Sequence, residues 1–318
     1  MILVISASGD LHARVVLDAL AGLGEPAHLV DLSTFPTRMT LTGAYQPDDA
    51  PRFRLCLADG SHVPLDEVRS VWWRRPQPYG VPATITDPVL RSFALSETST
   101  AFAGMWQTTD CLWVNDIGRD TAAAHKPWQL ALARQAGLTI PETLVTNDPD
   151  EARAFWSDHP GRVVYKPFLQ THAAWRETRV LRKEEEALAE SVRLAPVMFQ
   201  EWVPGAADLR VTVIGDEVFP AAAPLDGAAY DVDVRFNDVR YETHDLPDDV
   251  SAALLRLMDE LGLEYGAIDL RLTPDGGYVF FEVNPAGQFL YVEQATGQPI
   301  TAALAAHLRS GKPARGVA

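Results

Sequence analysis

The segment GAIDLRLTPDGGYVFFEVN, residues 266–284, constrains the fold of this chain more than any other part of the sequence. Two runs of alternating apolar residues flank a Pro-Asp-Gly-Gly turn at 274–277, a pattern that predicts a β-hairpin. Pairing across that turn sets Asp269 directly opposite Glu282 and leaves Asn284 on the same face, two residues further along its strand. The other face is apolar and suited to a core, with Ile268, Leu270, Leu272, Val279, Phe281 and Val283.

The three polar residues of this hairpin favour a metal site. Two carboxylates that face each other across paired strands repel unless a cation lies between them. Oxygen ligands from Asp, Glu and Asn suit a hard cation that keeps water and phosphate oxygens in its shell, which describes Mg²⁺. A solvated hairpin face would also carry acidic residues, but the matched register and the Glu-x-Asn spacing favour a site at Asp269, Glu282 and Asn284.

The composition limits the classes of partner. The chain has 318 residues and a formal net charge of −16, so its field repels nucleic-acid backbones and anionic membranes. Its two cysteines, Cys56 and Cys111, lack metal-binding spacing and argue against a disulfide framework or a thiolate zinc site. The apolar start MILVI has no basic leader, and no apolar run approaches the length of a membrane span. We therefore expect a cytoplasmic protein that binds neither nucleic acid nor membrane.

The order of elements predicts an α/β protein made of α+β lobes. A strand at 1–5, a helix that ends near Gly22 and a strand at 27–32 open a βαβ-like unit. We place a first lobe at 1–115. Helix and strand patterns alternate in two further stretches, which we assign to a central lobe at 116–200 and a C-terminal lobe at 201–318.

Two lysines and one connecting segment have features of a nucleotide site. Lys126 stands at the start of a predicted helix, where an ammonium and the helix dipole together suit a phosphate, although a surface lysine would look the same. Lys166 ends an apolar strand before a proline, so its side chain either extends into solvent or points into a cleft. The run Gln200–Val203 precedes a Pro-Gly turn, and a connecting strand with free backbone groups can bind the edge of an adenine ring.

The next strand, DLRVTVIG, carries Asp208 and Arg210 on one face, opposite the apolar Leu209 and Val211. Arg210 is therefore expected to be presented together with Asp208 and not buried in the core. A structural salt bridge explains this pair as well as a role in a site does.

In this order, K…YKP…QEWVPG…D-x-R…AIDLR…FEVN resembles the ATP-grasp superfamily. The resemblance implies an ATP-grasp fold with an N-terminal pre-ATP-grasp domain and with ATP clamped between the central and C-terminal lobes. It implies that Arg210 and Lys166 are catalytic cations, and that two Mg²⁺ ions are held by Asp269, Glu282 and Asn284. Adenine would meet the backbones of Glu201 and Val203. The implied ATP-binding residues are Lys126, Lys166, Gln200, Glu201, Trp202, Val203 and Asp208.

A finer resemblance comes from VWWRRP at 71–76, AHKPWQLALARQAGLTIPETLVTND at 124–148 and the run EVNPAGQFLYVEQATGQPI. These segments are similar to ATP-grasp ribosomal peptide maturases, the microviridin-type or graspetide macrocyclases. By this resemblance the partner is a precursor peptide with leader and core. Its Asp or Glu side chains would be activated as acyl phosphates and captured within the peptide as esters or amides. The oligomeric state is left open, and a homodimer is compatible with the sequence.

Several positions are candidates for contact with the substrate. Arg235 and Arg74, with Arg75 beside it, are isolated cations that suit the substrate carboxylate in an acidic protein. His172 and His244 are candidates for a general base, but each is better explained as a loop histidine, and we assign the role to neither. The loop FLQTHAAWRET after Lys166 has no glycine, which departs from the glycine-rich lid of many ATP-grasp enzymes and leaves the coverage of the phosphates undetermined.

Three other functions compete with peptide macrocyclisation. An ATP-grasp ligase that adds a free amino acid to a peptide or protein terminus would have the same nucleotide site. A non-catalytic ATP-binding module would not require Arg210 together with the whole metal set. A Rossmann-type oxidoreductase would depend on the turn Ser6–Gly9 alone, which lacks the dinucleotide fingerprint and is explained by a tight turn.

Overall fold

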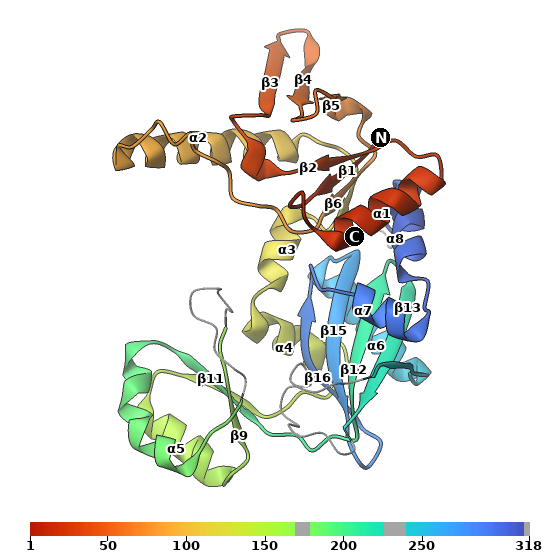
Figure 1. Ribbon diagram of the computed structural model, residues 1–318. Coiled ribbons are helices and arrows are strands. Elements are labelled where there is room, and N and C mark those ends of the chain that lie inside the picture. The colour runs from red at the N-terminus through yellow and green to blue at the C-terminus, as the bar shows by residue number, and fades with distance from the viewer. Residues whose placement is uncertain (169–178, 226–239, 315–318) are drawn as a thin grey trace.

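The computed structural model describes residues 1–168, 179–225 and 240–314 and has an elongated shape (Figure 1). The N-terminal lobe lies at one end, and the central and C-terminal lobes lie at the other. No helix among the described residues is long and apolar enough to cross a membrane. The mixture of helices and sheets confirms the predicted α/β class, whereas the lobe boundaries at 115 and 200 stay a proposal.

A parallel sheet with strand order β2-β1-β6-β7 forms the centre of the N-terminal lobe. Its strands are β1 (Ile2–Ile5), β2 (Ala27–Val30), β6 (Ser70–Trp73) and β7 (Leu112–Val114). Helix α1 (Leu11–Gly22) connects β1 to β2 and begins after Asp10, whose carboxylate accepts a hydrogen bond from the His12 N–H at 3.0 Å. Because the strands are parallel, the segments that follow β1, β6 and β7 meet at one edge of the sheet.

An antiparallel sheet and a long helix extend from this lobe (Figure 1). The sheet contains β3 (Thr40–Gln46), β4 (Asp49–Cys56) and β5 (His62–Pro64), and a turn at Asp59-Gly60 connects its last two strands. The helix α2 (Pro88–Gln107) packs on the lobe only through its last turns, where Phe102, Met105 and Trp106 are buried. Two 3-10 turns complete the lobe, η1 (Leu32–Thr34) and η2 (Leu65–Glu67).

Helices α3 (Ile117–Ala123) and α4 (Lys126–Gln135) lead out of the N-terminal lobe. Helix α4 begins with Pro127 in its first turn, as expected, and its Leu130 and Ala133 join the apolar core that also contains Phe280. Although we expected this helix in the central lobe, it packs on the C-terminal lobe.

The central lobe is a four-stranded antiparallel sheet in the order β10-β9-β11-β8. Its strands are β8 (Thr143–Thr146), β9 (Val163–Lys166), β10 (Arg179–Val180) and β11 (Val197–Glu201). Helix α5 (Pro149–Asp158) and the 3-10 helix η3 (Lys183–Leu194) cover one face, with Phe155, Trp156 and Phe199 in a core of their own.

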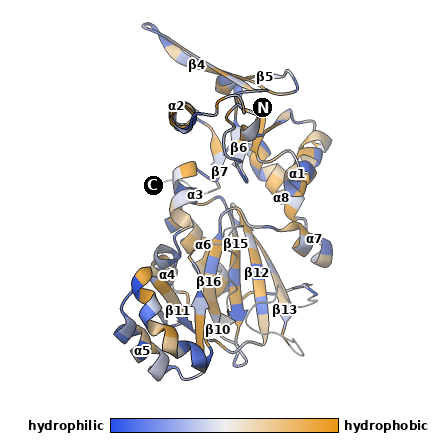
Figure 2. Ribbon diagram, turned by 60° about the vertical axis from the view of Figure 1, so that its left-hand side comes forward, coloured by the Kyte–Doolittle hydropathy of each residue, from blue (hydrophilic) through white to orange (hydrophobic). Residues whose placement is uncertain are grey.

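The C-terminal lobe is a five-stranded sheet in the order β14-β13-β12-β15-β16. Its strands are β12 (Ala207–Ile214), β13 (Glu217–Pro224), β14 (Glu242–Thr243), β15 (Tyr265–Leu272) and β16 (Tyr278–Asn284). Helices α6 (Asp248–Leu261), α7 (Leu290–Thr296) and α8 (Ile300–Ser310) pack against it. Figure 2 shows hydrophobic residues along β12 and β15, which supply the core face of the sheet.

The N-terminal and C-terminal lobes share one apolar core. Ile2, Val4 and Trp72 from the parallel sheet pack in the same cluster as Phe289 and Leu304 from the end of the chain. The central lobe, by contrast, has its own small core. The N-terminal and C-terminal lobes are therefore joined by buried apolar surface. The central lobe is attached to them mainly through its connecting segments.

The predicted hairpin forms β15 and β16, and its pairing of Asp269 with Glu282 is confirmed. The register shifts beyond this pair, so that Leu270 faces Phe280 across a β-bulge. The prediction that Phe281 belongs to the core face is wrong: Phe280 is fully buried in the core, and the bulge leaves Phe281 half-buried on the polar face.

Candidate active site

Charged residues form a row across three neighbouring strands of the C-terminal sheet. Arg210 on β12 is paired with Asp269 on β15, and Asp269 is paired with Glu282 on β16. Directly paired residues share a face of the sheet, so the three side chains lie side by side. The Arg210 Nη1 donates to the Asp269 Oδ1 at 2.7 Å. The row therefore contains one cation and two carboxylates within a single register.

Arg210 is more enclosed than the sequence indicated, because only 9% of its surface is exposed. The loop after β16 covers it: a Cβ atom placed on Gly287 would lie 2.8 Å from the Arg210 Nη2, and the same Nη2 donates to the Gln288 carbonyl at 3.2 Å. Burial opposes the charge, but the attraction of Asp269 outweighs it and raises the pKa of Arg210 above its ordinary value. Arg210 is a fixed cation under a backbone loop, and it is not paired with Asp208.

Lys126 reaches the same row from helix α4, where its Nζ forms an ion pair with the Glu282 Oε2. One turn later, the buried Gln129 side chain binds the edge of β16: its Nε2 donates to the Val283 carbonyl at 2.8 Å, and its Oε1 accepts from the Val283 N–H at 2.9 Å. Residues three apart on a helix share a face, so docking of Gln129 on the strand brings Lys126 to Glu282.

The metal-binding residues predicted from the hairpin are brought together. Asp269 and Glu282 have 36% and 31% of their side-chain surface exposed, and Asn284 is exposed one step along the strand. The Asn284 Oδ1 accepts from the Ala286 N–H at 3.0 Å, which fixes the amide oxygen while leaving it a second lone pair. Three accessible oxygen ligands next to cationic side chains fit Mg²⁺. These residues therefore remain our candidates for the metal ligands.

Asp208 has a different partner from the one that the sequence indicated. Arg271, paired with it in register on β15, binds both of its carboxylate oxygens at 2.6 and 2.9 Å. The Arg271 Nη1 also donates to the Val203 carbonyl at 2.9 Å, although Arg271 is only 3% exposed. A Cβ atom on Gly205 would lie 2.8 Å from the Arg271 Cδ. Arg271 thus connects the segment between the lobes to the sheet that carries the charged row.

The backbone of that connecting segment is held at several points. The Glu201 N–H donates to the Glu142 carbonyl at 2.8 Å, and the Trp202 N–H donates to the Arg162 carbonyl at 2.6 Å. Among the described residues, the Val203 N–H has no hydrogen bond. The Gln200 side chain is buried and donates to the Thr143 Oγ1 at 3.0 Å. Hydrogen bonds therefore hold the segment at Glu201 and Trp202 and leave the Val203 N–H without a partner in the part of the chain that the structure describes.

A cluster of ionisable groups lies beside the same segment. The Glu142, Glu201 and His159 side chains have ligand atoms within 4.8 Å of one another. His159 is 3.2 Å from Glu142, and Arg162 is 3.7 Å from Glu201. Each of the two carboxylates lies beside one basic side chain, His159 or Arg162, so the cluster is a polar network that fastens the segment to the central lobe.

Lys166 connects the central lobe to the charged row through the bulge. Lys166 and Met198 are paired in register, and Met198 belongs to the core of the C-terminal lobe, so this face of the central sheet is the one that faces that lobe. The Lys166 Nζ lies 4.7 Å from the centre of the Phe281 ring, and the Arg271 guanidinium lies 5.5 Å from the same ring. The Phe281 ring therefore lies beside two cations and stabilises their positions.

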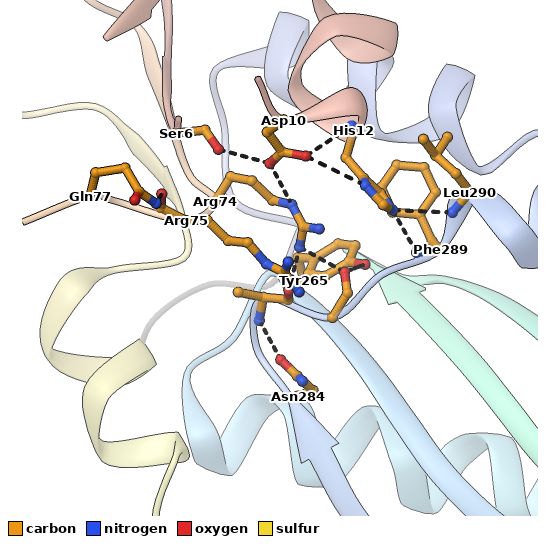
Figure 3. Close-up of polar contacts among 12 residues, drawn as sticks. Ser6, Asp10, His12, Arg74, Arg75, Gln77, Tyr265, Asn284, Phe289 and Leu290 are labelled. Atoms are coloured by element: carbon orange, nitrogen blue, oxygen red, sulfur yellow. Dashed lines mark hydrogen bonds and ion pairs between the residues drawn. The ribbon is translucent and has the colours of Figure 1, made fainter. Parts of the chain in front are cut away.

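The predicted role of Arg74 in substrate binding does not fit its position (Figure 3). Arg74 is 1% exposed, forms an ion pair with Asp10 at 3.4 Å, and donates to the carbonyls of Ala286 and Gly287. Its guanidinium is therefore enclosed by protein groups. The adjacent Arg75 is exposed and stays a candidate for the substrate carboxylate.

Two other sequence-based candidates, Arg235 and His172, lie outside the described residues. His244 accepts or donates a hydrogen bond with the Tyr278 hydroxyl at 2.9 Å, next to the turn of the hairpin. This position is at the opposite end of β16 from Asn284. We therefore assign His244 no catalytic role.

Several residues of the site were not identified from the sequence. Arg271 lies two residues after Asp269 on the same strand, and this spacing alone could have placed it on the polar face. Gln129, one turn after Lys126, could have been noticed as a polar residue on the apolar side of its helix. The remaining ones form long-range contacts that no local pattern indicates: Asp10, His12, Asn115 and Tyr265.

Comparison with known proteins gives one family-model match and several similar solved structures. A family model described as the MvdD pre-ATP grasp domain matches residues 1–121. The macrocyclase MdnC from Microcystis aeruginosa MRC, solved bound with the precursor peptide MdnA, is 32% identical, with a TM-score of 0.85 over 97% of this chain and 99% of that one. The ATP-grasp ligase PsnB, solved with a minimal precursor, Mg and ADP, is 29% identical, with a TM-score of 0.79 over 98% and 96%.

A third structure shows the same fold at lower identity. A RiPP-associated ATP-grasp ligase from Chryseobacterium gregarium, in complex with ADP and a leader and core peptide, is 24% identical, with a TM-score of 0.88 over 98% of this chain and 97% of that one. A comparison with curated protein sequences gave no significant match. The identity and coverage shared with MdnC, together with the charged row and the pre-ATP-grasp lobe, show that this chain is an ATP-dependent ligase that belongs to the ATP-grasp ribosomal peptide maturases.

Proposed function

We propose that this ligase activates Asp or Glu side chains of a ribosomal precursor peptide as acyl phosphates and closes rings within that peptide. A Ser or Thr hydroxyl or a Lys amine of the peptide then displaces the phosphate and forms an ester or an amide. The observation that carries the proposal is the row Arg210–Asp269–Glu282, flanked by Lys126, on a chain that matches the peptide-bound macrocyclase MdnC over almost its whole length. A protein that binds ATP without catalysis does not require this complete set.

Asp269, Glu282 and Asn284 are the residues that would hold two Mg²⁺ ions. The ions, when bound, supply charge neutralisation at the phosphates and orient the transferred group. The carboxylates suit this role because each is partly exposed and has a cation on one side, and the Asn284 amide is fixed by the Ala286 N–H.

The segment between the lobes suits the adenine ring. An adenine edge offers an amino donor and a ring-nitrogen acceptor, which the Glu201 carbonyl and the Val203 N–H would meet. Arg271 holds the Val203 carbonyl and Asp208 at the same time, so it fixes this segment relative to the ribose position proposed for Asp208. Gln200 and Trp202 would complete the nucleotide pocket from the same strand.

The cations around the row suit the phosphates. Lys126 and Lys166 approach from two different lobes and would bind phosphate oxygens, while Arg210 would steady the transferred phosphoryl group and the acyl phosphate. Arg210 is held on one side by Asp269 and on the other by the Gln288 carbonyl, so its guanidinium needs no reorganisation during transfer. Arg75, exposed at the adjacent sheet edge, would receive the substrate carboxylate, with Arg235 as a second candidate.

The proposal is tested by incubating the protein with ATP, Mg²⁺ and the precursor peptide encoded beside its gene, and by measuring the peptide mass. We expect the loss of one water per ring, dependent on ATP and abolished in Asp269→Ala and Glu282→Ala. Asp275→Ala is the matched control, because Asp275 is an exposed carboxylate in the turn of the same hairpin. An unchanged peptide, with ADP released only when free amino acids are added, would refute macrocyclisation and indicate the amino-acid-adding ligase.

A further inference from the structure

The loop that follows β16, residues 285–290, covers Arg210 in the charged row. Gly287 has no side chain, and a Cβ atom there would lie 2.3 Å from the Ala267 Cβ and 2.8 Å from the Arg210 Nη2. The Gln288 carbonyl accepts from Arg210, and the Ala286 N–H donates to Asn284. The path of this backbone therefore determines where the Arg210 guanidinium and the Asn284 amide oxygen point.

Side chains from the N-terminal lobe hold the first three carbonyls of this loop. The Asn115 Nδ2, at the end of β7, donates to the Pro285 carbonyl at 3.0 Å. Arg74, at the end of β6, donates through its Nη1 to the Ala286 carbonyl and, at 2.8 Å, to the Gly287 carbonyl. Two residues at the carboxyl edge of the N-terminal sheet thus bind three consecutive carbonyls of a loop in the C-terminal lobe.

The end of the loop is held by His12 (Figure 3). The His12 Nε2 accepts from the Phe289 N–H at 3.2 Å and lies 3.4 Å from the Leu290 nitrogen, so its ring proton is on Nδ1. Asp10 lies between His12 and Arg74, at 3.5 Å from the His12 Nδ1 and 3.4 Å from the Arg74 Nε, and it also accepts from the Ser6 hydroxyl at 2.7 Å. One carboxylate therefore orients Arg74 and His12, two of the three N-terminal side chains that hold the loop.

This arrangement places a charge where an apolar contact would suffice for adhesion. The Arg74 side chain has no exposed surface, and the surrounding interface already contains the apolar cluster of Trp72 and Phe289. A buried guanidinium is expensive in free energy unless its donors are matched. The Arg74 Nη1 donates to two successive backbone carbonyls, whereas the buried Nε and Nη2 form no hydrogen bond among the described residues, so this cost is only partly offset. The two bonds from Nη1 fix the direction of the loop, which apolar packing does not do.

We propose that Arg74 and Asn115 are positioning residues for phosphoryl transfer, which act by holding the loop 285–290 so that Arg210 and Asn284 keep their orientation. The proposal rests on the function proposed above. Asp10 and His12 support it by fixing Arg74 and the end of the loop. The N-terminal lobe is then part of the catalytic geometry and not only an attached domain.

Ser70 provides a matched control on the same strand. It lies at the other end of β6, is fully buried, and its hydroxyl donates to the Leu308 carbonyl of the C-terminal lobe at 2.8 Å. Ser70→Ala therefore removes a buried contact between the same two lobes, far along the strand from the loop. General weakening of the interface affects this variant as well, whereas loss of positioning does not.

The test compares Arg74→Met, Arg74→Lys, Asn115→Ala and Ser70→Ala in two measurements. Hydrogen–deuterium exchange of the protein without nucleotide reports on the amides of Ala286, Phe289 and Leu290. Arg74→Met should accelerate their exchange roughly tenfold, and Ser70→Ala should leave it unchanged. Peptide cyclisation should show a kcat about 10- to 100-fold lower in Arg74→Met and Asn115→Ala, with a KM for ATP within about threefold of the unsubstituted protein. Arg74→Lys keeps the charge but not the planar guanidinium, and its kcat should lie between those of Arg74→Met and the unsubstituted protein.

Loop amides that exchange at the unsubstituted rate in Arg74→Met would overturn the proposal, as would a fall in kcat no larger than that of Ser70→Ala. If Arg74→Met does not fold, Arg74→Lys and Asn115→Ala give the same comparison. An unsubstituted protein that cyclises no peptide refutes the proposed function, and the exchange measurement still decides whether Arg74 holds the loop.

Discussion

The C-terminal sheet and the edge of the N-terminal sheet both carry an arginine that reaches the loop 285–290, but the two regions are built differently. In the C-terminal sheet, Arg210, Asp269 and Glu282 are neighbours because three strands are in register. At the N-terminal edge, Arg74 and Asn115 reach the loop across a lobe boundary, from positions about two hundred residues away in the chain. Register determines which groups meet in the first region, and packing of lobes determines it in the second. The first should carry the chemistry, and the second its alignment.

The largest effect is expected for Arg210, which separates the two regions most clearly. Arg210→Met removes the cation from the row and leaves Asp269 without its partner, so kcat should fall by about 10³-fold, well beyond the effect of Arg74→Met. Single-turnover measurement of acyl transfer checks this. Equal losses in both variants would remove the distinction between chemistry and alignment.

Arg271 should show the second largest effect, and mainly on nucleotide binding. Arg271→Met removes the cation bound to the half-buried Asp208 and releases the Val203 carbonyl, so we expect stability to fall by about 3 kcal/mol and the KM for ATP to rise about tenfold. Chemical denaturation and steady-state kinetics measure the two changes. Arg256→Met is the control, because Arg256 also donates to a backbone carbonyl, that of Ala136, on the far side of the lobe. A similar KM for ATP in both variants would contradict the proposed role of Arg271 in holding the segment between the lobes.

The β-bulge offers a finer comparison between two adjacent phenylalanines. Phe281→Leu removes the ring beside Lys166 and should raise the KM for ATP about two- to fivefold with little loss of stability. Phe280→Leu leaves a gap in the core and should lower stability by about 1 kcal/mol without changing the KM. Titration with ATP and thermal unfolding of both variants give the result. The reverse assignment of the two effects would mean that the bulge is placed incorrectly.

The last predicted effect is on stability and not on activity, and it concerns pH and the helix α3 that leaves the N-terminal lobe. Burial and the nearby Asp116 raise the pKa of Asp120 to about 6, against an ordinary value of 3.8. Between these pH values the folded protein holds a proton that the unfolded chain has lost, so the stability contribution of Asp120 falls as pH rises from about 4 to about 6. Asp120→Asn should therefore stabilise the protein by about 1–2 kcal/mol at pH 7.5 and by little at pH 4. Denaturation at both pH values checks this, and equal effects at the two would disprove it.

The contrast between strand register and lobe packing also explains which features of the fold and the site could be predicted from the sequence. The pairing of Asp269 with Glu282 was predicted because a short turn fixes the register of both strands. The bulge was missed because the residues on either side are both phenylalanine, and either can fill the core. Lys126 was identified by its helix position, but its contact with Glu282 depends on the docking of Gln129.

The enclosure of Arg74 shows the limit most clearly. Its sequence context, an arginine at the end of an apolar strand in an acidic protein, indicates a cation available to a substrate. The structure covers it with carbonyls of a loop that the chain reaches only 212 residues later. Local patterns contain the strand and its carboxyl edge, but they contain no information on which distant backbone will close over that edge.

Each carboxylate of the row already has its own basic side chain: Lys126 for Glu282 and Arg210 for Asp269. A free divalent ion would have to displace these counter-ions, and the displaced ammonium and guanidinium would gain nothing in return. Triphosphate oxygens arriving together with the ion would provide new partners for both cations. Metal and nucleotide should consequently bind as one species, with the affinity of each low in the absence of the other. The basic side chains would thereby prevent divalent ions from binding to the site in the absence of nucleotide.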